Sequence, residues 1–375
     1  MTAELFIGLM SGTSMDGIDA VLVELAEADF VARHAIGVEY EASLGARLRD
    51  IAHRPKDGHI EDLGALHVAV AHAFADAARR LMTEAGVTPA DVVAIGSHGQ
   101  TVLHRPDDEH PFSLQLGDPG TLAARTGVTV VADFRTADIA LGGQGAPLAP
   151  AFHRWAFGDS GELRAVINIG GIANVTLLDP AGTTTGYDTG PGNVLLDQWC
   201  RENTGAPFDA RGHWAATGVV DAALLAQLQD DPYFARPAPK STGTDYFNGG
   251  WLQVHLRRCG GTTSPADIQA TLSELSATTI AASIREAHAS AICGGGAHND
   301  DLMNRLRRLL HPRNVSSTTE WGVDPDWVEA VAFAWLAKQR LAGEPTNVPA
   351  VTGAKSEVSL GGVFLAPISL DRGPI

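Results

Sequence analysis

One local pattern occurs twice in this chain and constrains its fold more than any other feature. An apolar run (residues 5–10) leads into the turn SGTSMDG, and a second apolar run follows at 18–25. In the second half, the run AVINIGG (165–171) leads in the same way into NVTLLD (174–179). Apolar runs around glycine, serine and aspartate are typical of two strands joined by a turn. A motif that returns in the second half of a chain indicates an internal duplication.

The remaining segments alternate between strand-like and helical patterns. The apolar run 30–40 extends the first pair of strands to a meander, and a long helical pattern follows at 61–85. Further strands are predicted at 92–97, 101–104, 113–117, 128–134 and 289–293, and further helices at 194–203, 222–229, 265–288, 326–342 and from about residue 299. The polar, proline-containing stretch 231–248 is typical of a loop, with a lid edge as one interpretation. We therefore predict a mixed α/β protein with two related halves.

Charge and cysteine usage exclude several classes of partner. The chain has 375 residues and a formal net charge of -17, which disfavours nucleic acid or an anionic membrane as a partner. A small phosphate ligand stays compatible, because backbone N–H groups can bind it without lysine. Cys200, Cys259 and Cys293 form no CxxC pair, and no signal peptide or membrane span is evident. We expect a protein of the reducing cytoplasm.

Three glycine-rich segments are candidates for binding phosphate or a flat ligand. SGTSMDGID (11–19) offers backbone N–H groups, hydroxyls and a carboxylate, Asp16, that could orient hydrated Mg²⁺. NIGGIANVT (168–176) adds the amide of Asn174, and CGGGAHND (293–300) follows an apolar strand. The alternatives are an ordinary polar hairpin for the first and a glycine bend of the sheet for the second. None of the three matches a dinucleotide or P-loop fingerprint.

Two further segments carry candidate catalytic and binding side chains. GYDTGPGN (186–193) is predicted to hold Asp188 in a rigid turn before a helix, where a carboxylate can act as a general base or simply cap the helix. DFRTADIALGGQGAPL (133–148) combines Asp133, Arg135 and Asp138 with glycines, and arginine can clamp a carboxylate with two hydrogen bonds. A solvated loop is the alternative. The two histidines of SHGQTVLH (97–104) are interpreted as polar contacts, since no metal-binding cluster accompanies them.

Taken in order, these segments resemble the anhydro-N-acetylmuramic acid kinase family. The resemblance is carried by IGLMSGTSMDGIDAVLVE, GSHGQTVLHRP, SLQLGDP, VADFRTADIALGGQGAPLAP, INIGGIANVTLL, GYDTGPGN, ICGGGAHND and DPDWVEAVAFAWLA, which span residues 7 to 342. It implies an α/β fold of two ribonuclease-H-like domains around an ATP cleft, as in actin, sugar kinases and heat-shock ATPases. The expected domains are residues 1–160 with 343–375, and residues 161–342.

The resemblance also implies roles for individual residues. Asp188 is the expected catalytic base. The expected ATP-binding residues are Gly12, Thr13, Ser14, Met15, Asp16, Gly17, Ile18, Asp19, Gly170, Gly171, Asn174, Gly294, Gly295 and Gly296. The residues expected at the sugar are Gln100, Arg135, Asp138 and Glu329, with Arg135 suited to the lactyl carboxylate of a muramic acid. ATP and Mg²⁺ are expected, with no metal ligand assigned, and a homodimer is suggested.

The implied reaction opens a ring and transfers a phosphoryl group. Water attacks the anomeric carbon of 1,6-anhydro-N-acetylmuramic acid, and the released 6-oxygen takes the γ-phosphoryl group of ATP. The product is N-acetylmuramic acid 6-phosphate, and the role is cell-wall recycling. The alternatives are an ordinary sugar kinase of the same fold, acting on an intact hydroxyl, and a non-enzymatic actin-like ATP-binding protein.

Overall fold

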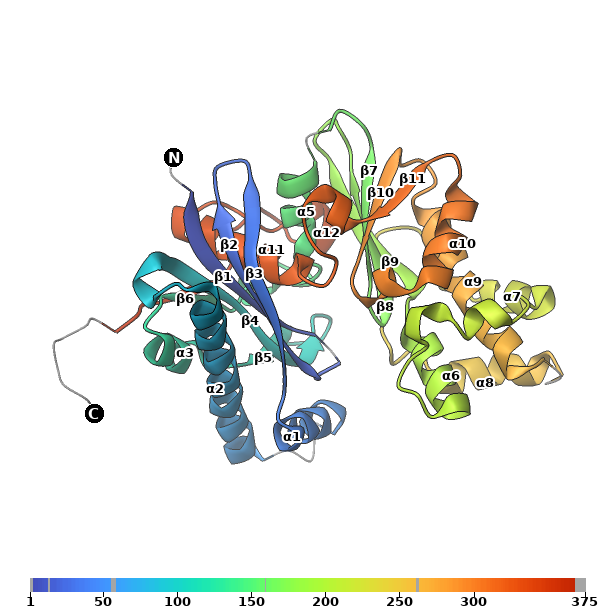
Figure 1. Cartoon of the computed structure of the whole chain (residues 1–375), viewed down its shortest axis with the longest axis horizontal. Helices are drawn as coiled ribbons and strands as arrows, with labels where there is room; N and C mark the ends of the chain where they lie inside the picture. The colour runs from blue at the N-terminus through green and yellow to red at the C-terminus, as the bar shows by residue number, and fades with distance from the viewer. Residues whose placement is uncertain (1–2, 13, 55–58, 159, 261–262, 368–375) are drawn as a thin grey trace. The chain divides into compact units, whose positions relative to one another are not determined.

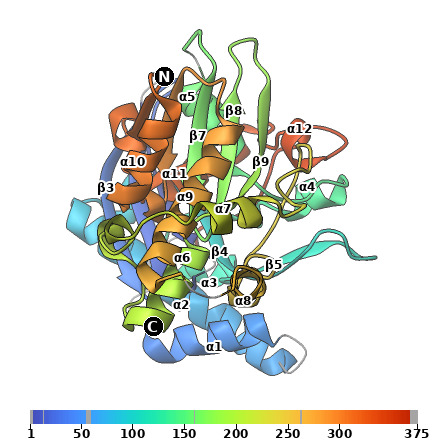
Figure 2. The same cartoon turned by 90° about the vertical axis from the view of Figure 1, so that its right-hand side faces the viewer.

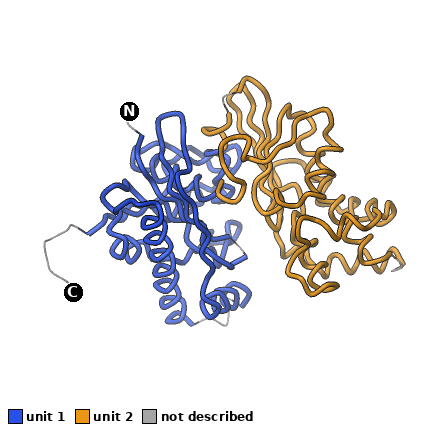
Figure 3. Tube along the Cα trace, in the orientation of Figure 1, with its two compact units in different colours: residues 1–152, 329–375 blue, residues 153–328 orange. Residues whose placement is uncertain are grey.

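The chain divides into two compact units, which we describe separately. The computed structural model describes residues 3–12, 14–54, 59–158, 160–260 and 263–367. The first unit comprises residues 1–152 with 329–375, and the second comprises residues 153–328 (Figure 3). The predicted domain ranges, 1–160 with 343–375 and 161–342, remain a prediction. The compact units differ from them in placing helix α11 (Val328–Ala342) with the first unit from Glu329 onward.

The first unit is built on a mixed sheet whose strand order is β3-β2-β1-β4-β6-β12, with β5 also paired to β4 (Figure 1). β1, β2 and β3 are antiparallel neighbours, whereas β4 runs parallel to β1 and to β6. The strands are β1 (Glu4–Ser11), β2 (Gly17–Leu25), β3 (Phe30–Glu39), β4 (Val92–Arg105), β5 (Phe112–Leu116), β6 (Val130–Ala132) and β12 (Gly362–Phe364). An antiparallel meander followed by parallel strands is the arrangement of a ribonuclease-H-like domain.

Helix α2 (Ile60–Ala85) covers one face of this sheet (Figure 1). Its Leu66, Val70 and Phe74 recur at helical spacing and join Ile7 and Leu9 of β1 in one buried core. The helix ends where Gly86 takes a left-handed conformation (φ 70°), and its N–H donates to the last turn. The other helices of the unit are α1 (Ala42–His53), α3 (Pro119–Thr126), α4 (Thr136–Ala140) and α12 (Pro349–Thr352), and α5 (Ala149–Phe157) crosses into the second unit.

Helix α11 packs against β1 and β4 at a pair of glycines. Gly8 and Gly96 are direct partners in the parallel pairing of the two strands. A Cβ on Gly8 would lie 1.7 Å from the carbonyl oxygen of Ala330, and one on Gly96 would lie 1.9 Å from that of Phe333. Because neither distance leaves room for a side chain, the backbone of α11 approaches the sheet as closely as two glycines allow.

The second unit repeats the plan of the first. Its sheet has the order β9-β8-β7-β10-β11, with β7, β8 and β9 antiparallel and β10 parallel to β7 and β11. The strands are β7 (Arg164–Ile169), β8 (Ile172–Leu178), β9 (Thr184–Pro191), β10 (Ala289–Cys293) and β11 (Asn314–Ser317). The shared strand order confirms the two related halves that the sequence predicted. Both halves are ribonuclease-H-like, and the fold class is confirmed.

Helices α9 (Pro265–Ser283) and α10 (Asp300–Leu310) cover one face of the second sheet (Figure 2). Ile280 of α9 and Leu302 of α10 pack on Ile167 and Val175 in a single buried core. Helices α6 (Val194–Thr204), α7 (Ala222–Gln229) and α8 (Gly249–Arg258) form a further cluster with α9. The stretch 231–248 holds no helix or strand, as predicted.

Three predicted elements differ from the structure. The strands predicted at 92–97 and 101–104 are one strand, β4, which continues through Gly99 because glycine accepts its left-handed φ of 72°. The helix predicted at 265–288 ends at Ser283, after which Ile284 leaves helical geometry. The turn predicted around Asp188 is wrong: Asp188 lies inside β9, and the chain turns only after Pro191. Cross-strand pairing with β8 outweighs the glycines on either side of it.

Candidate active site

In the first unit, the loop between β1 and β2 is held from below by two buried side chains. The Ser11 hydroxyl lies 2.6 Å from the carbonyl oxygen of Gly17 and 2.7 Å from Oε1 of Gln100. Nε2 of Gln100 donates to the carbonyl oxygen of Gly12 at 3.0 Å. Gln100 is fully buried, so its amide shapes the loop rather than facing solvent. In this structure the amide contacts the loop, and its predicted contact with sugar stays a prediction.

The tip of the same loop is fixed in a strained conformation. Met15 has a positive φ of 54°, which is unfavourable outside glycine, yet its side chain is buried. Arg49 donates to the carbonyl oxygen of Met15 at 3.2 Å, and the N–H of Tyr40 donates to that of Asp16 at 2.9 Å. Strain held by contacts of this kind is typical of a binding loop.

The predicted phosphate-binding residues of this loop fall into three groups. Gly12, Ser14 and Asp16 lie on the loop itself, where the Ser14 hydroxyl donates to the Asp16 carboxylate at 2.7 Å. The side chains of Met15 and Ile18 are buried, so only their backbones can meet a phosphate. Gly17 and Asp19 begin β2. Thr13 lies outside the described residues.

Arg135 is fixed by a carbonyl and a histidine. Its Nη1 donates to the carbonyl oxygen of Gly145 at 2.6 Å, and its Nη2 lies 2.7 Å from Nε2 of His98. Burial lowers the pKa of the guanidinium to about 10, and the Glu329 carboxylate partly offsets this. Arg135 is therefore a cation at neutral pH. It lies in the electrostatic field of Glu329, which is also expected at the sugar.

His98 makes a polar contact, as the sequence predicted, and its partner is Arg135. It is 5% exposed, and burial together with the neighbouring Arg135 holds its pKa well below its usual value. The imidazole is therefore neutral, and Nε2 accepts the hydrogen bond from Arg135. His98 sets the direction of the guanidinium. The only signal in the sequence was a histidine beside a glycine in an apolar strand.

Asp138 is held in a buried hydrogen-bond network, and its predicted contact with the sugar stays a prediction. It is fully buried, and its Oδ2 accepts from the N–H of Gly145 at 2.8 Å. Its Oδ1 accepts from Asn347 Nδ2 at 2.9 Å and from the Thr352 hydroxyl at 2.7 Å. A carboxylate with these partners fixes the loop that holds Arg135, and we assign it a positioning role.

In the second unit, the hairpin between β7 and β8 turns at Gly170 and Gly171. Their carbonyl oxygens accept from the N–H groups of Asn193 at 2.8 Å and Gly192 at 2.9 Å. A Cβ on Gly192 would lie 2.4 Å from the carbonyl oxygen of Gly170, so only glycine fits there. The hairpin is thereby attached to the segment that leads into α6.

Asp188 lies in a row of polar side chains across three strands. Asn168 of β7 pairs with Asn174 of β8, which pairs with Asp188 of β9, so the three side chains share one face of the sheet. That face is opposite to the core packed under α9, because the intervening Ile167 and Val175 belong to that core. The structure therefore brings together the predicted base and one predicted ATP ligand, Asn174.

The environment of Asp188 keeps its carboxylate basic. Burial raises its pKa from 3.8 to about 6, and a hydrogen bond from the N–H of Thr242 to Oδ2 at 2.9 Å partly offsets this. The backbone of Asp188 is also held: its N–H donates to the carbonyl of Lys240 at 3.0 Å, and its carbonyl accepts from the Tyr233 hydroxyl at 2.6 Å. A carboxylate with a pKa just below neutral is suited to accept a proton.

The glycines after β10 leave room on one side. Gly294 has a φ of 74°, and a Cβ there would meet Asn168 Oδ1 at 2.3 Å. A Cβ on Gly296 would meet Ile169 Cγ2 at 2.3 Å, whereas at Gly295 the nearest atom would be 3.8 Å away. The segment thus packs on the end of β7 and leaves its backbone exposed at Gly295.

Neither a metal-binding cluster nor a membrane helix is found in the part of the chain that the structure describes. Among these residues, no group of three or more histidine, cysteine, aspartate or glutamate side chains could hold a metal ion. Within the same ranges, every helix is too short or too polar to cross a bilayer.

Comparison with known proteins gives one consistent result. A family model described as anhydro-N-acetylmuramic acid kinase matches residues 4–366. A protein of that description from Coxiella burnetii (strain RSA 493 / Nine Mile phase I) is 49% identical over 97% of this chain and 98% of the relative. Relatives of the same description from Shewanella amazonensis and Photobacterium profundum are 48% and 45% identical, each over 98% of this chain and 100% of the relative.

Proposed function

This chain belongs to the anhydro-N-acetylmuramic acid kinase family, and on that premise we propose which of its residues carry each part of the reaction. The chain is an ATP-dependent kinase. It opens 1,6-anhydro-N-acetylmuramic acid with water and phosphorylates it to N-acetylmuramic acid 6-phosphate, a step of cell-wall recycling. The expected resemblance to this family is thereby confirmed.

Asp188 is the base that activates water. The observation that carries this assignment is its half-buried carboxylate with a pKa of about 6, fixed at Oδ2 by the Thr242 N–H. The ionised carboxylate takes a proton from water as the water oxygen bonds to the anomeric carbon and the bond from that carbon to the 6-oxygen breaks. The electron pair left on the 6-oxygen forms the new bond to the γ-phosphorus of ATP, and ADP leaves. No separate acid is needed, because phosphorus takes up the developing charge.

Arg135 binds the lactyl carboxylate of the sugar. Its guanidinium is held by His98 and by the carbonyl of Gly145, and it is charged at neutral pH. Glu329 lies in its field and is proposed to accept a hydrogen bond from a sugar hydroxyl. Fixed donors of this kind lower the entropic cost of orienting the sugar.

The loop from Gly12 to Asp19 binds the phosphates of ATP through backbone N–H groups, and Gly170, Gly171 and Asn174 supply further donors. The Gly294–Gly296 segment flanks the adenosine. Mg²⁺ is proposed to be held mainly by phosphate oxygens and water, with Asp16 orienting the hydrated ion, since phosphoryl transfer depends on positioning and charge neutralisation. A cytoplasmic location and a homodimer stay predictions from the sequence.

The deciding experiment measures ADP release with Mg-ATP and either 1,6-anhydro-N-acetylmuramic acid or open N-acetylmuramic acid. We expect ADP release that depends on the anhydro sugar and a 6-phosphate product that carries one oxygen from labelled water at the anomeric carbon. ADP release only with the open sugar would instead indicate an ordinary kinase. ADP release indifferent to both sugars would indicate an ATP-binding protein without this activity.

A further inference from the structure

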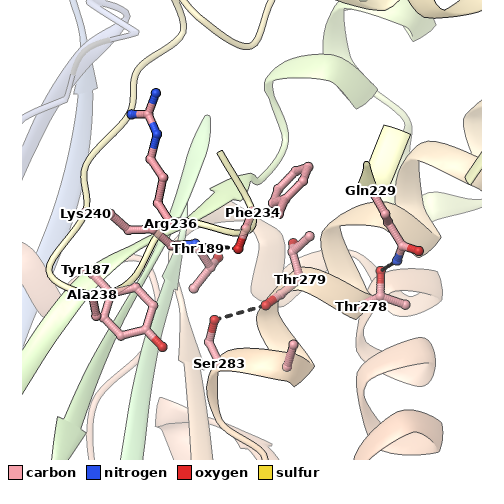
Figure 4. Close-up of a pocket in the computed structure, with 11 residues that line it drawn as sticks. Tyr187, Thr189, Gln229, Phe234, Arg236, Ala238, Lys240, Thr278, Thr279 and Ser283 are labelled. Atoms are coloured by element: carbon pink, nitrogen blue, oxygen red, sulfur yellow. Dashed lines mark hydrogen bonds between the residues drawn. The ribbon is translucent and has the colours of Figure 1, made fainter. Parts of the chain in front are cut away.

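A pocket in the second unit lies on the other face of β9 from Asp188. Its volume is about 350 Å³, and it is lined by β9, by the segment 234–240, by the last two turns of α9 and by Gln229 of α7 (Figure 4). Tyr187 and Thr189, which flank Asp188 in the chain, both line it. Small-molecule sites typically enclose about 300–1,000 Å³, so the pocket is large enough for one small ligand.

The charge in this pocket is positive, in a chain with a formal net charge of -17. Arg236 and Lys240 line it, and none of its lining residues is acidic. The Lys240 ammonium donates to the carbonyl oxygens of Tyr233 at 3.3 Å and Phe234 at 3.2 Å, and it lies 4.8 Å from the Tyr233 ring centroid. In the described ranges, no carboxylate forms an ion pair with either cation. The electrostatic field of the pocket therefore favours the binding of an anionic ligand.

The end of α9 weakens this attraction without cancelling it. The C-terminus of a helix carries roughly half a negative charge. Two full cations outweigh it, so an anion remains favoured close to Arg236 and Lys240. The anionic group of a ligand is therefore expected on the side of the 234–240 segment, away from the helix.

The wall formed by α9 offers hydrogen-bond acceptors. The Thr279 hydroxyl donates to the carbonyl of Ser276 at 3.1 Å, and the Ser283 hydroxyl donates to that of Thr279 at 3.0 Å. Each hydroxyl already donates its single hydrogen to a carbonyl of the helix, so its oxygen can only accept a hydrogen bond from a ligand. A matching ligand carries hydroxyl or amide donors at one end and an anion at the other.

We propose that this pocket binds a small sugar phosphate and that the bound ligand slows catalysis through the segment 233–242. Phosphate meets Arg236 and Lys240, and the sugar hydroxyls meet the oxygens of Thr279 and Ser283. The product of the reaction belongs to this chemical class, so the site would sense its accumulation. The choice of product as ligand rests on the activity stated above, whereas the anion site itself does not.

The coupling runs through hydrogen bonds that the segment makes to Asp188. Tyr233 donates to its carbonyl, the Lys240 carbonyl accepts from its N–H, and the Thr242 N–H donates to its carboxylate. A phosphate draws the Lys240 ammonium away from the two carbonyls that it now contacts. Because the same segment fixes the base, this movement lowers turnover without competing with the sugar.

Direct binding tests the site independently of activity. We would titrate the protein with glucose 6-phosphate and with N-acetylmuramic acid 6-phosphate by calorimetry, without ATP or anhydro sugar. Arg236→Gln should lower the affinity for glucose 6-phosphate by about tenfold. Ser283→Phe, which fills the pocket, should abolish the binding of glucose 6-phosphate. Arg258→Gln removes an exposed arginine of α8 outside the pocket and is the matched control, with affinity expected unchanged.

Inhibition kinetics test the coupling. Product should inhibit wild-type ADP formation with a noncompetitive component against the anhydro sugar, and Ser283→Phe should leave only competitive inhibition. Equal affinity for glucose 6-phosphate in wild type, Arg236→Gln and Ser283→Phe would overturn the proposed site. If binding is weakened by Arg236→Gln and lost in Ser283→Phe while the inhibition pattern does not change, the coupling is overturned.

Discussion

Asp188→Asn separates the stability of the protein from its activity, and the size of the effect follows from the pKa. Raising the pKa of this carboxyl from 3.8 to about 6 means that the folded protein disfavours its ionised form. One pKa unit corresponds to about 1.4 kcal/mol, so the cost at neutral pH is at most about 3 kcal/mol. Because the side chain is partly exposed, we expect about 1 to 3 kcal/mol. Asparagine has nearly the same shape and still offers Thr242 an acceptor oxygen, but it carries no charge.

The sign of this effect depends on pH. Between pH 3.8 and about 6 the folded wild type binds more protons at Asp188 than the unfolded chain does, so its stability falls as the pH rises through this window. Above the window the whole cost is present. Asp188→Asn should therefore be more stable than wild type at pH 7.5, and the difference should shrink to less than about 1 kcal/mol near pH 4. Turnover should fall by about 10²–10⁴-fold.

Urea unfolding followed by tryptophan fluorescence measures the difference. Six of the seven tryptophans lie in the second unit, so the signal reports mainly on the part that contains Asp188. Asp230→Asn, at an exposed aspartate of the same unit, is the control and should change stability by less than about 0.5 kcal/mol. An Asp188→Asn variant that is less stable than wild type at pH 7.5, or whose advantage is the same at both pH values, would refute the reasoning.

Four further outcomes follow from the described contacts. The kcat/KM of the wild type should decline on the acid side with an apparent pKa near 6 and be about tenfold lower at pH 5 than at neutral pH; a flat profile would contradict the assignment of the base. Arg135→Ala should raise the KM for the sugar more than it lowers kcat, and an unchanged KM would mean that Arg135 does not touch substrate. His98→Ala should raise the same KM by about tenfold or more, since a hydrogen bond to a charged group contributes about 1.5–3 kcal/mol; a fall in kcat alone would argue against this role. Gly8→Ala should lower the unfolding free energy by about 3 kcal/mol or more, because its Cβ would lie 1.7 Å from a carbonyl of α11, whereas Gly64→Ala in α2, with no atom within 4 Å, should be neutral or stabilising; similar effects would mean that the helix can shift.

The sequence predicted those features of the fold that depend on neighbouring residues. Strand, turn and strand around Gly12, and again around Gly170, follow from local alternation and turn chemistry, and the repeated pattern correctly indicated two related halves. The helix 61–85 was predicted almost to its ends, because its apolar residues recur at helical spacing.

The contacts that shape the candidate site depend on residues far apart in the chain. Asp188 was expected in a turn because of its flanking glycines, but pairing with Asn174 keeps it in a strand. The link from His98 to Arg135 joins β4 to the loop after β6, and the burial of Asp138 depends on Asn347 and Thr352 near the other end of the chain. No local pattern encodes such partners, so the sequence did not predict the buried contacts of Gln100 and Asp138.

The close contact of α11 with Gly8 and Gly96 fixes the position of this helix along β1. Ala330 lies against Gly8, and Glu329 is the preceding residue of the helix. The loop proposed to bind phosphate begins at Gly12, four residues after Gly8, a separation of about 13 Å along an extended strand. Because the backbone of α11 lies directly against the backbone of the two glycines, the helix cannot shift along the strand. A family member that adapted to a longer or shorter sugar could not change the distance between Glu329 and the loop at Gly12 by shifting α11. Its substrate range would have to change through the loops around Arg135, where insertions and exchanged side chains leave the position of α11 unchanged.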